Sequence, residues 1–169
     1  MRVTIVDSLN KSKDQLYIAV NDWFIRSFIN GRSIIQLNDK EAGVIIGKGY
    51  VRNVAEHVLF ASSANVSAWI IIRVDLKDNK MKITTTIQKY DMKIGTGVIG
   101  AMNTGLNGTP DSKDFERWLP QNYFPFVKRS SYKRTAAKAF VNCHIYSLVL
   151  ADKLAEAATN GITGTEDNW

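Results

Sequence analysis

Cysteine and long apolar runs are both scarce in this sequence, and each shortage excludes a class of protein. Cys143 is the only cysteine among 169 residues, so the chain cannot close an intramolecular disulfide. No stretch approaches the roughly 18 apolar residues of a membrane-spanning helix, because Arg73 interrupts the run at residues 69–72. The N-terminus reaches Asp7 before an apolar segment of signal-peptide length forms. We therefore expect no transmembrane segment, and either a cytoplasmic protein or one whose leader has been removed.

Charge of one sign does not dominate either, and the length suits a single domain. Lysine and arginine number 22 against 16 aspartate and glutamate residues, which gives a formal net charge of +6. This excess favours acidic partners weakly without naming one. A chain of this length buries roughly 70% of the surface that its unfolded form exposes. The core should therefore suffice without disulfides, while the lone cysteine leaves the redox compartment undecided.

The clearest predicted helix begins after Ser12. Its apolar residues recur at steps of three and four, and they are Leu16, Ala19, Val20, Trp23, Phe24, Ser27 and Phe28. Ser12 has the position of an N-cap, and Gln15 that of its capping-box partner. Asn30 followed by Gly31 supplies a left-handed stop. We expect one face of this helix to be buried.

A second long helix is predicted over residues 131–158, and Asn160 with Gly161 should end it. Its predicted buried stripe consists of Ala137, Phe140, Val141, His144, Leu148, Ala151 and Ala155. The tail that follows should be flexible.

Strand patterns fill most of the sequence between the helices. The predicted strands are residues 3–6, 33–37, 42–52, 69–76 and 81–90. Residues 53–66 are too mixed to assign. Gly43, Gly47 and Gly49 share one side of a strand, and close packing by a helix explains them better than a ligand does. Together these patterns predict an α+β fold, in which two long helices pack on one face of an antiparallel sheet of about five strands.

The same patterns divide the chain into three regions. Residues 1–92 form a strand-helix-sheet region, and residues 131–169 supply the last helix on the same domain together with its tail. Residues 93–130 are a glycine-rich loop followed by an aromatic segment at residues 123–126. A short helix is predicted at residues 112–119 within that loop.

One face of the hairpin at residues 69–90 is a candidate partner-binding surface. The aliphatic side should turn toward the helices, which leaves the other side open. The candidate partner-binding residues on that open side are Trp69, Ile71, Arg73, Lys82, Thr84, Thr86 and Tyr90, with Gln88 beside them. Aromatic and basic side chains on a sheet can stack bases or hold a protein edge. The alternative is that residues 123–126, or a second copy of the chain, cover this face.

A basic cluster surrounds the start of the second helix, and it is a candidate anion-binding site. Its residues are Lys128, Arg129, Lys133, Arg134 and Lys138, with Tyr132 among them. Positive charge at a helix N-terminus opposes the macrodipole, so an acidic surface or anion could offset the cost. An ordinary solvated basic face is the simpler interpretation.

The remaining motifs carry no catalytic or cofactor site. The glycine pattern from Gly95 to Gly100 matches a dinucleotide-binding loop, but no helix begins inside it, so a flexible loop explains it better. His57, Cys143 and His144 have no metal-ligand spacing. Asp75 and Asp78 border a hairpin turn, where solvation explains their charge. We expect no cofactor and no metal, and an enzyme is disfavoured because polar groups do not converge on a predicted pocket.

Several runs in the first half of the chain resemble a known family. These are Ser12-Lys13-Asp14-Gln15-Leu16-Tyr17, Trp23-Phe24, Ser33-Ile34-Ile35-Gln36, Asp39-Lys40-Glu41-Ala42-Gly43 and Ile45-Ile46-Gly47-Lys48-Gly49. The likeness covers residues 3–92 and points to an uncharacterised family of exported proteins from Bacteroides-type bacteria. That family is described as a domain of unknown function with a TATA-binding-protein-like (TBP-like) fold. The resemblance implies a cell-envelope location, often behind a lipoprotein leader, and supplies no catalytic residues.

These observations leave three hypotheses about function. The first is a non-enzymatic envelope module that binds a protein, a peptide or a small ligand through the open sheet face, with a homo-oligomer as one possible arrangement. The second is binding of nucleic acid or of an acidic surface, which the basic balance suggests but which an exported protein would rarely need. The third, an enzyme, is disfavoured.

Overall fold

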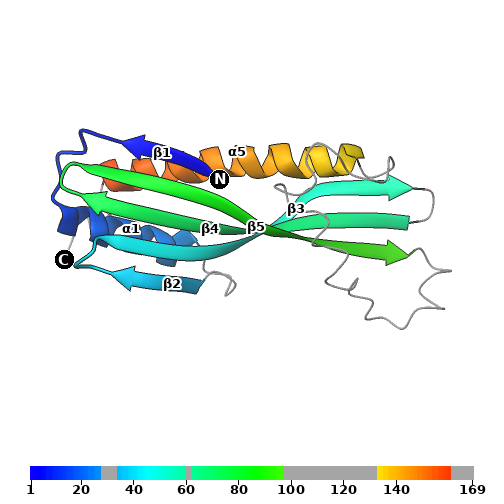
Figure 1. Cartoon of the computed structure of the whole chain (residues 1–169), viewed down its shortest axis with the longest axis horizontal. Helices are drawn as coiled ribbons and strands as arrows, with labels where there is room; N and C mark the ends of the chain where they lie inside the picture. The colour runs from blue at the N-terminus through cyan, green and yellow to red at the C-terminus, as the bar shows by residue number, and fades with distance from the viewer. Residues whose placement is uncertain (28–33, 60–61, 97–132, 161–169) are drawn as a thin grey trace, which may run out of the picture. The chain divides into compact units, whose positions relative to one another are not determined.

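The computed structural model describes residues 1–27, 34–59, 62–96 and 133–160, and Figure 1 draws the helices and strands that they form. In chain order these are β1 (Arg2–Val6), α1 (Lys13–Ser27), β2 (Ile34–Asp39), β3 (Val44–Leu59), β4 (Ser62–Lys77), β5 (Lys80–Thr96) and α5 (Lys133–Asn160). The strands form one sheet in the order β1-β5-β4-β3-β2. The predicted α+β fold, with five antiparallel strands and two long helices, is confirmed.

The chain divides into two compact units, and the three long strands and α5 contribute to both. The first unit comprises Met1–Gly49, Ile71–Thr86 and Tyr146–Trp169, and the second comprises Tyr50–Ile70 and Ile87–Ile145. The first unit thus contains β1, α1 and β2 complete, together with one end of each long element.

Helix α1 begins as the sequence predicts, with a reciprocal capping box. The Ser12 amide donates to Gln15 Oε1 at 3.0 Å, and the Gln15 amide donates to Ser12 Oγ at 3.3 Å. The helix buries Leu16, Ala19, Val20 and Phe24, which belong to the predicted stripe. The predicted stop at Asn30 lies outside the described residues.

Helix α1 lies on one face of the first unit's sheet, and a glycine makes close packing possible. A Cβ atom at Gly47 would collide with the ring of Phe24, so only glycine lets that strand and the helix approach as they do. This contact confirms helix packing as the reason for glycine at position 47. Gly43 has a different role, because its φ of +66° needs a residue without a side chain.

The end of α5 is held within the first unit by a lysine in the loop before α1. Lys11 Nζ donates to the backbone oxygens of Ala158 and Thr159 at 2.7 and 2.8 Å. A cation at this position satisfies terminal carbonyls and complements the negative end of the helix dipole. Figure 1 shows α1 and this part of α5 on the same face of the first unit's sheet.

The long strands β3, β4 and β5 alternate strictly between the two faces of the sheet within the first unit. Ile72, Val74, Leu76, Met81 and Ile83 are buried on the helix-covered face, as the sequence predicts. Full burial of such a side chain contributes roughly 1.5–3 kcal/mol relative to exposure, so this row is a major part of the core.

Alternation breaks in the second unit. Asn53 has a φ of 55°, and its amide donates to Ser67 Oγ at 3.3 Å. Beside this irregularity Val54 and Ala55 are both buried although they are consecutive. The core there consists of Val54, Ala55, Val66, Ala68, Tyr90, Ala139 and Cys143. Residues 53–66 could not be assigned from the sequence, because the alternation of buried and exposed residues is interrupted where the two long strands β3 and β4 run.

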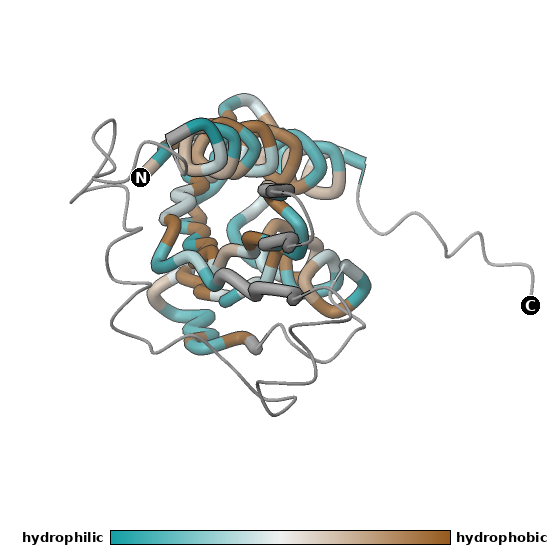
Figure 2. Tube along the Cα trace, turned by 90° about the vertical axis from the view of Figure 1, so that its right-hand side faces the viewer, coloured by the Kyte–Doolittle hydropathy of each residue, from teal (hydrophilic) through white to brown (hydrophobic). Residues whose placement is uncertain are grey.

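The predicted buried stripe of the last helix is wrong. Apart from Ala151, the buried residues are a different set: Thr135, Ala139, Cys143, Ser147, Leu154 and Ala158. The predicted residues Ala137, Val141 and Leu148 are exposed instead, and Figure 2 shows hydrophobic and hydrophilic residues mixed along this helix. Small side chains let a helix approach its neighbours closely, whereas the prediction gave weight to large apolar ones.

The structure changes or leaves open the other predictions about this half of the chain. Strand β5 continues to Thr96, so residues 93–96 are strand rather than loop. The predicted helix at 112–119, the aromatic segment at 123–126 and the C-terminal tail lie outside the described residues. In the part of the chain that is described, no helix is long and apolar enough to cross a membrane.

Candidate functional site

The open face of the first unit's sheet brings together five of the predicted partner-binding residues. Arg73 and Lys82 are exposed, and Ile71, Thr84 and Thr86 are half-buried. They alternate with the buried row on β4 and β5, so they turn away from the face that α1 covers. This surface is called the open face below.

An ion-pair network occupies the centre of the open face. Arg73 Nη2 lies 2.6 Å from Asp75 Oδ1, and Lys82 Nζ lies 3.2 Å from Asp75 Oδ2. The hydrogen bond from Arg73 lowers the pKa of the Asp75 carboxyl, helped by Lys82 and opposed by partial burial. The same hydrogen bond raises the pKa of Arg73. One carboxylate thus neutralises part of the charge of two cations.

The two acidic residues beside the hairpin turn have roles that the sequence interpretation missed. The sequence contained a signal for Asp75. It points to the same side of its strand as Arg73, and the predicted hairpin places it across from Lys82. Asp78 Oδ1 accepts a hydrogen bond from the Lys13 amide at 2.8 Å, so it satisfies a free N–H group at the start of α1. Both aspartates therefore have specific partners, and solvation alone does not explain their positions.

Exposed aliphatic side chains lie on both edge strands of this sheet. Val3 and Ile5 on β1 are 47% and 63% exposed, and Leu37 on β2 is 47% exposed. The strand register places Val3 beside Thr84 and Ile5 beside Lys82. These residues were not predicted, because strand order cannot be read from a single sequence.

Trp69 and Tyr90 belong to the second unit, whereas the other predicted partner-binding residues belong to the first. Trp69 Nε1 donates to Asp91 Oδ2 at 2.7 Å, and its ring lies 4.8 Å from that of Tyr50. Tyr90 is only 3% exposed, so its predicted place on the open face is wrong. The alternation slips after Thr86, and the ring enters the core.

Tyr90 meets the lone cysteine in that core. Burial raises the pKa of the Cys143 thiol to about 12, and a hydrogen bond with Tyr90 opposes part of this increase. Burial also raises the pKa of the Tyr90 hydroxyl. A thiol held protonated in this way is a poor nucleophile, and it behaves as a small core residue.

The predicted anion-binding cluster is only partly described. Arg134 and Lys138 are exposed on the first turns of α5, which begins at Lys133. Lys128 and Arg129 lie outside the described residues. Anion binding by this cluster therefore stays a prediction.

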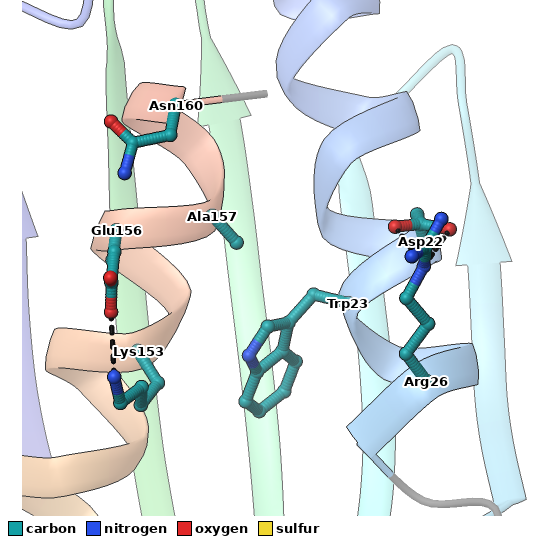
Figure 3. Close-up of a pocket in the computed structure, with 7 residues that line it drawn as sticks. All are labelled: Asp22, Trp23, Arg26, Lys153, Glu156, Ala157 and Asn160. Atoms are coloured by element: carbon teal, nitrogen blue, oxygen red, sulfur yellow. Dashed lines mark hydrogen bonds and ion pairs between the residues drawn. The ribbon is translucent and has the colours of Figure 1, made fainter. Parts of the chain in front are cut away.

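A groove between α1 and the end of α5, within the first unit, was not predicted (Figure 3). Its volume is about 230 Å³, and its lining residues are Asp22, Trp23, Arg26, Lys153, Glu156, Ala157 and Asn160. The indole of Trp23 projects from α1 into the space between the helices. Trp23 was predicted to lie in the buried stripe of α1, but it is half-buried.

Two ion pairs flank the Trp23 ring, one on each helix. Arg26 Nε lies 2.8 Å from Asp22 Oδ2, and Lys153 Nζ lies 2.8 Å from Glu156 Oε2. The hydrogen bond to Glu156 raises the pKa of Lys153. Charges in the groove are thus balanced, which suits a neutral polar molecule with one flat apolar side.

No metal centre is formed by the described side chains: no group of three or more histidine, cysteine, aspartate or glutamate residues is suitably placed there. The His144 ring instead lies edge-on to Phe140, with 4.4 Å between the ring centroids.

One solved structure agrees with this fold, and a second was found with a lower similarity. A TBP-like protein from Parabacteroides distasonis ATCC 8503 is similar in structure, with a TM-score of 0.56 and 17% identity over 94% of this chain and 92% of that chain. A DUF4468 family protein from Bacteroides ovatus ATCC 8483 has a TM-score of 0.44 and 16% identity over 89% and 84% of the two chains. No curated protein matches the sequence.

A family model provides the assignment. It matches residues 3–91, which cover α1, β2, β3 and β4 completely and most of β1 and β5. The match spans more than half of the chain and agrees with the resemblance read from the sequence. The chain therefore belongs to the family described as a domain of unknown function (DUF4468) with TBP-like fold.

Proposed function

We propose that this protein is a non-enzymatic binding module that contacts a protein or peptide through the open face of its first unit. The observation that carries the proposal is the exposure of Val3, Ile5 and Leu37 around the Arg73 network. Exposed aliphatic side chains around a central arginine are typical of protein interfaces, where arginine is enriched and apolar surface is buried on binding.

The charge arrangement favours a protein over a nucleic acid at this face. Asp75 is paired with both Arg73 and Lys82, so less positive charge is available to replace the counterions of phosphates. The described groups with raised or lowered pKa values are explained by the ion pairs at Asp75 and at Lys153 and by core burial, which supports binding rather than catalysis as the role of the chain.

A pull-down from envelope extracts with matched variants tests this proposal. We expect the double variant Ile71→Ala and Arg73→Ala to lose a partner that the wild type retains, because it removes the centre of the open face. Trp23→Ala changes the groove on the helix side and serves as the control, which should retain the partner. Equal recovery by wild type and the open-face variant would exclude this surface.

Oligonucleotide binding decides between the two classes of macromolecule. A salt-sensitive gel shift that depends on Arg73 would overturn the choice of a protein partner, and no shift at low salt would retire the nucleic-acid alternative.

A second candidate function is binding of a small neutral polar molecule in the groove beside Trp23. The half-buried ring and the two flanking ion pairs support it. Titration with a neutral monosaccharide, followed by NMR of the indole N–H signals, tests it. The Trp23 signal should move in the wild type and be missing in Trp23→Ala, and an unmoved Trp23 signal would refute this candidate.

We also propose that the protein is located in the cell envelope, as the family resemblance implies. Cell fractionation against a cytoplasmic marker tests it: recovery with the envelope would support it, and recovery with the cytoplasmic marker would refute it.

A further inference from the structure

We propose that the free edge of strand β1 pairs with strand β1 of a second copy of this chain, which would join two copies in one antiparallel sheet. Among the described strands, β1 and β2 stand at the two ends of the sheet. An edge strand has unpaired backbone N–H and C=O groups, which proteins usually protect with bulges, charges or proline. The two edges of this sheet differ in that protection.

Strand β2 carries several protective features. Its register with β3 shifts between Ile35 and Leu37, and such irregularities hinder pairing with another strand. The Asn38 side chain is engaged by α1, because Tyr17 Oη donates to it at 2.6 Å and it donates to Asn21 at 2.8 Å.

Strand β1 has none of these features. Its register with β5 is unbroken from Arg2 to Val6, and it contains no proline and one charged residue. Its exposed side chains are the aliphatic Val3 and Ile5. This edge is regular, apolar and almost uncharged, which is the combination that favours strand addition.

The direction of the backbone groups in β1 follows from the neighbouring strands. The Leu76 amide donates to the Gly43 oxygen at 2.7 Å, so Leu76 turns its backbone toward β3. In an antiparallel ladder, successive residues turn to opposite sides, so Asp75 turns toward β5. Only two residues separate the end of β4 at Lys77 from the start of β5 at Lys80, so Asp75 lies across from Lys82, whose backbone therefore turns toward β4.

The same alternation continues into β1. Ile83 follows Lys82 and turns toward β1, where it pairs with Thr4. Thr4 therefore turns its backbone toward β5. Its neighbours Val3 and Ile5 consequently direct their N–H and C=O groups toward the free edge.

A two-fold antiparallel pair centred on Thr4 satisfies these groups. Val3 of each copy then lies opposite Ile5 of the other, and about four backbone hydrogen bonds form. The aliphatic pairs that result are favourable cross-strand contacts. Arg2 lies opposite Val6, so the two arginines are at opposite ends of the interface. This strand is thus complementary to itself, which is what a two-fold interface requires and why the second copy is the partner we choose.

Sedimentation equilibrium over a range of protein concentrations tests the assembly. The wild type should rise from 19.0 kDa toward twice that mass, since a short interface of this kind gives weak, concentration-dependent association. Ile5→Lys places a cation at the edge, where it should raise the dissociation constant at least tenfold. Leu37→Lys makes the same change on β2 and should leave association unchanged.

Disulfide trapping tests the register independently. In the proposed pair the two Thr4 residues face each other with Cα atoms about 4.5 Å apart, which suits a disulfide. Thr4→Cys should therefore cross-link readily under oxidation, and Val3→Cys much more slowly. The native Cys143 is buried and should not interfere.

Three outcomes would overturn the inference. They are a wild type that stays at 19.0 kDa at every concentration, equal effects of Ile5→Lys and Leu37→Lys, and faster trapping of Val3→Cys than of Thr4→Cys. The inference goes beyond the proposed function, because two copies can pair with no other partner bound. Its failure would leave the open face to be tested separately.

Discussion

The two units of this molecule use the same three long strands in different ways. In the first unit the strands alternate strictly, so one side forms a core row and the other an open face with charged and aliphatic groups. In the second unit Asn53 interrupts the alternation, and consecutive residues such as Val54 and Ala55 are both buried. Strand regularity therefore determines where a separate binding face can exist.

The largest expected effect comes from the core row of the first unit. Ile72→Ala should lower the free energy of unfolding by about 2–5 kcal/mol, because it leaves a cavity in a fully buried site. Ile71→Ala changes the adjacent residue on the open face, and its effect should stay below about 1 kcal/mol. Urea denaturation of both variants measures the difference, and equal losses would refute strict alternation in this unit.

A smaller loss is expected where helix α1 meets the sheet. Gly47→Ala should cost about 1–3 kcal/mol, because the new methyl group collides with the Phe24 ring. In the Phe24→Leu background the same substitution should cost much less, and a double-mutant cycle measures this coupling. Additive losses would show that the glycine is there for another reason.

The second unit should respond to alkaline pH through its buried thiol. The pKa of Cys143 is raised from 9.0 to about 12 in the fold, so the folded state holds its proton after the unfolded state has released it. The free energy of unfolding should therefore fall as pH rises through this window, by about 1 kcal/mol at pH 10. Cys143→Ala should lose this part of the pH dependence, although Tyr90 titrates in the same direction. A wild type and variant with identical pH profiles would contradict the effect.

The smallest effect is expected at the ion-pair network. The pKa of Asp75 is lowered by Arg73, so its contribution to stability is present above the ordinary value of 3.8 and is lost as pH falls below it. Because the pair is partly exposed, Asp75→Asn should cost less than about 1 kcal/mol at neutral pH. Thermal unfolding at neutral and acidic pH measures it. A larger loss at neutral pH would mean that the network supports the fold rather than a binding face.

The first unit could largely be predicted from the sequence, because its signals are local and periodic. The capping box at Ser12 and the buried row from Ile72 to Ile83 followed from spacing alone. Val3 and Ile5 required the strand order, which no local signal supplies, whereas Asp75 could have been placed from the predicted hairpin that sets it across from Lys82. The open-face set was therefore predicted only in part.

The structure of the second unit and of α5 was harder to predict from the sequence, for a physical reason. Tyr90 was expected on the wrong face because one slip in the ladder reverses every later side chain. The buried stripe of α5 was missed because it uses small residues such as Ala139 and Ser147, to which hydrophobicity gives little weight.

NMR mapping of the bound partner on the wild-type protein tests the open face most directly. The amide signals that move on binding should belong to Ile71, Arg73, Lys82 and Thr84, while those around Trp23 should stay in place. Signals that move around Trp23 and leave β4 and β5 unchanged would contradict it.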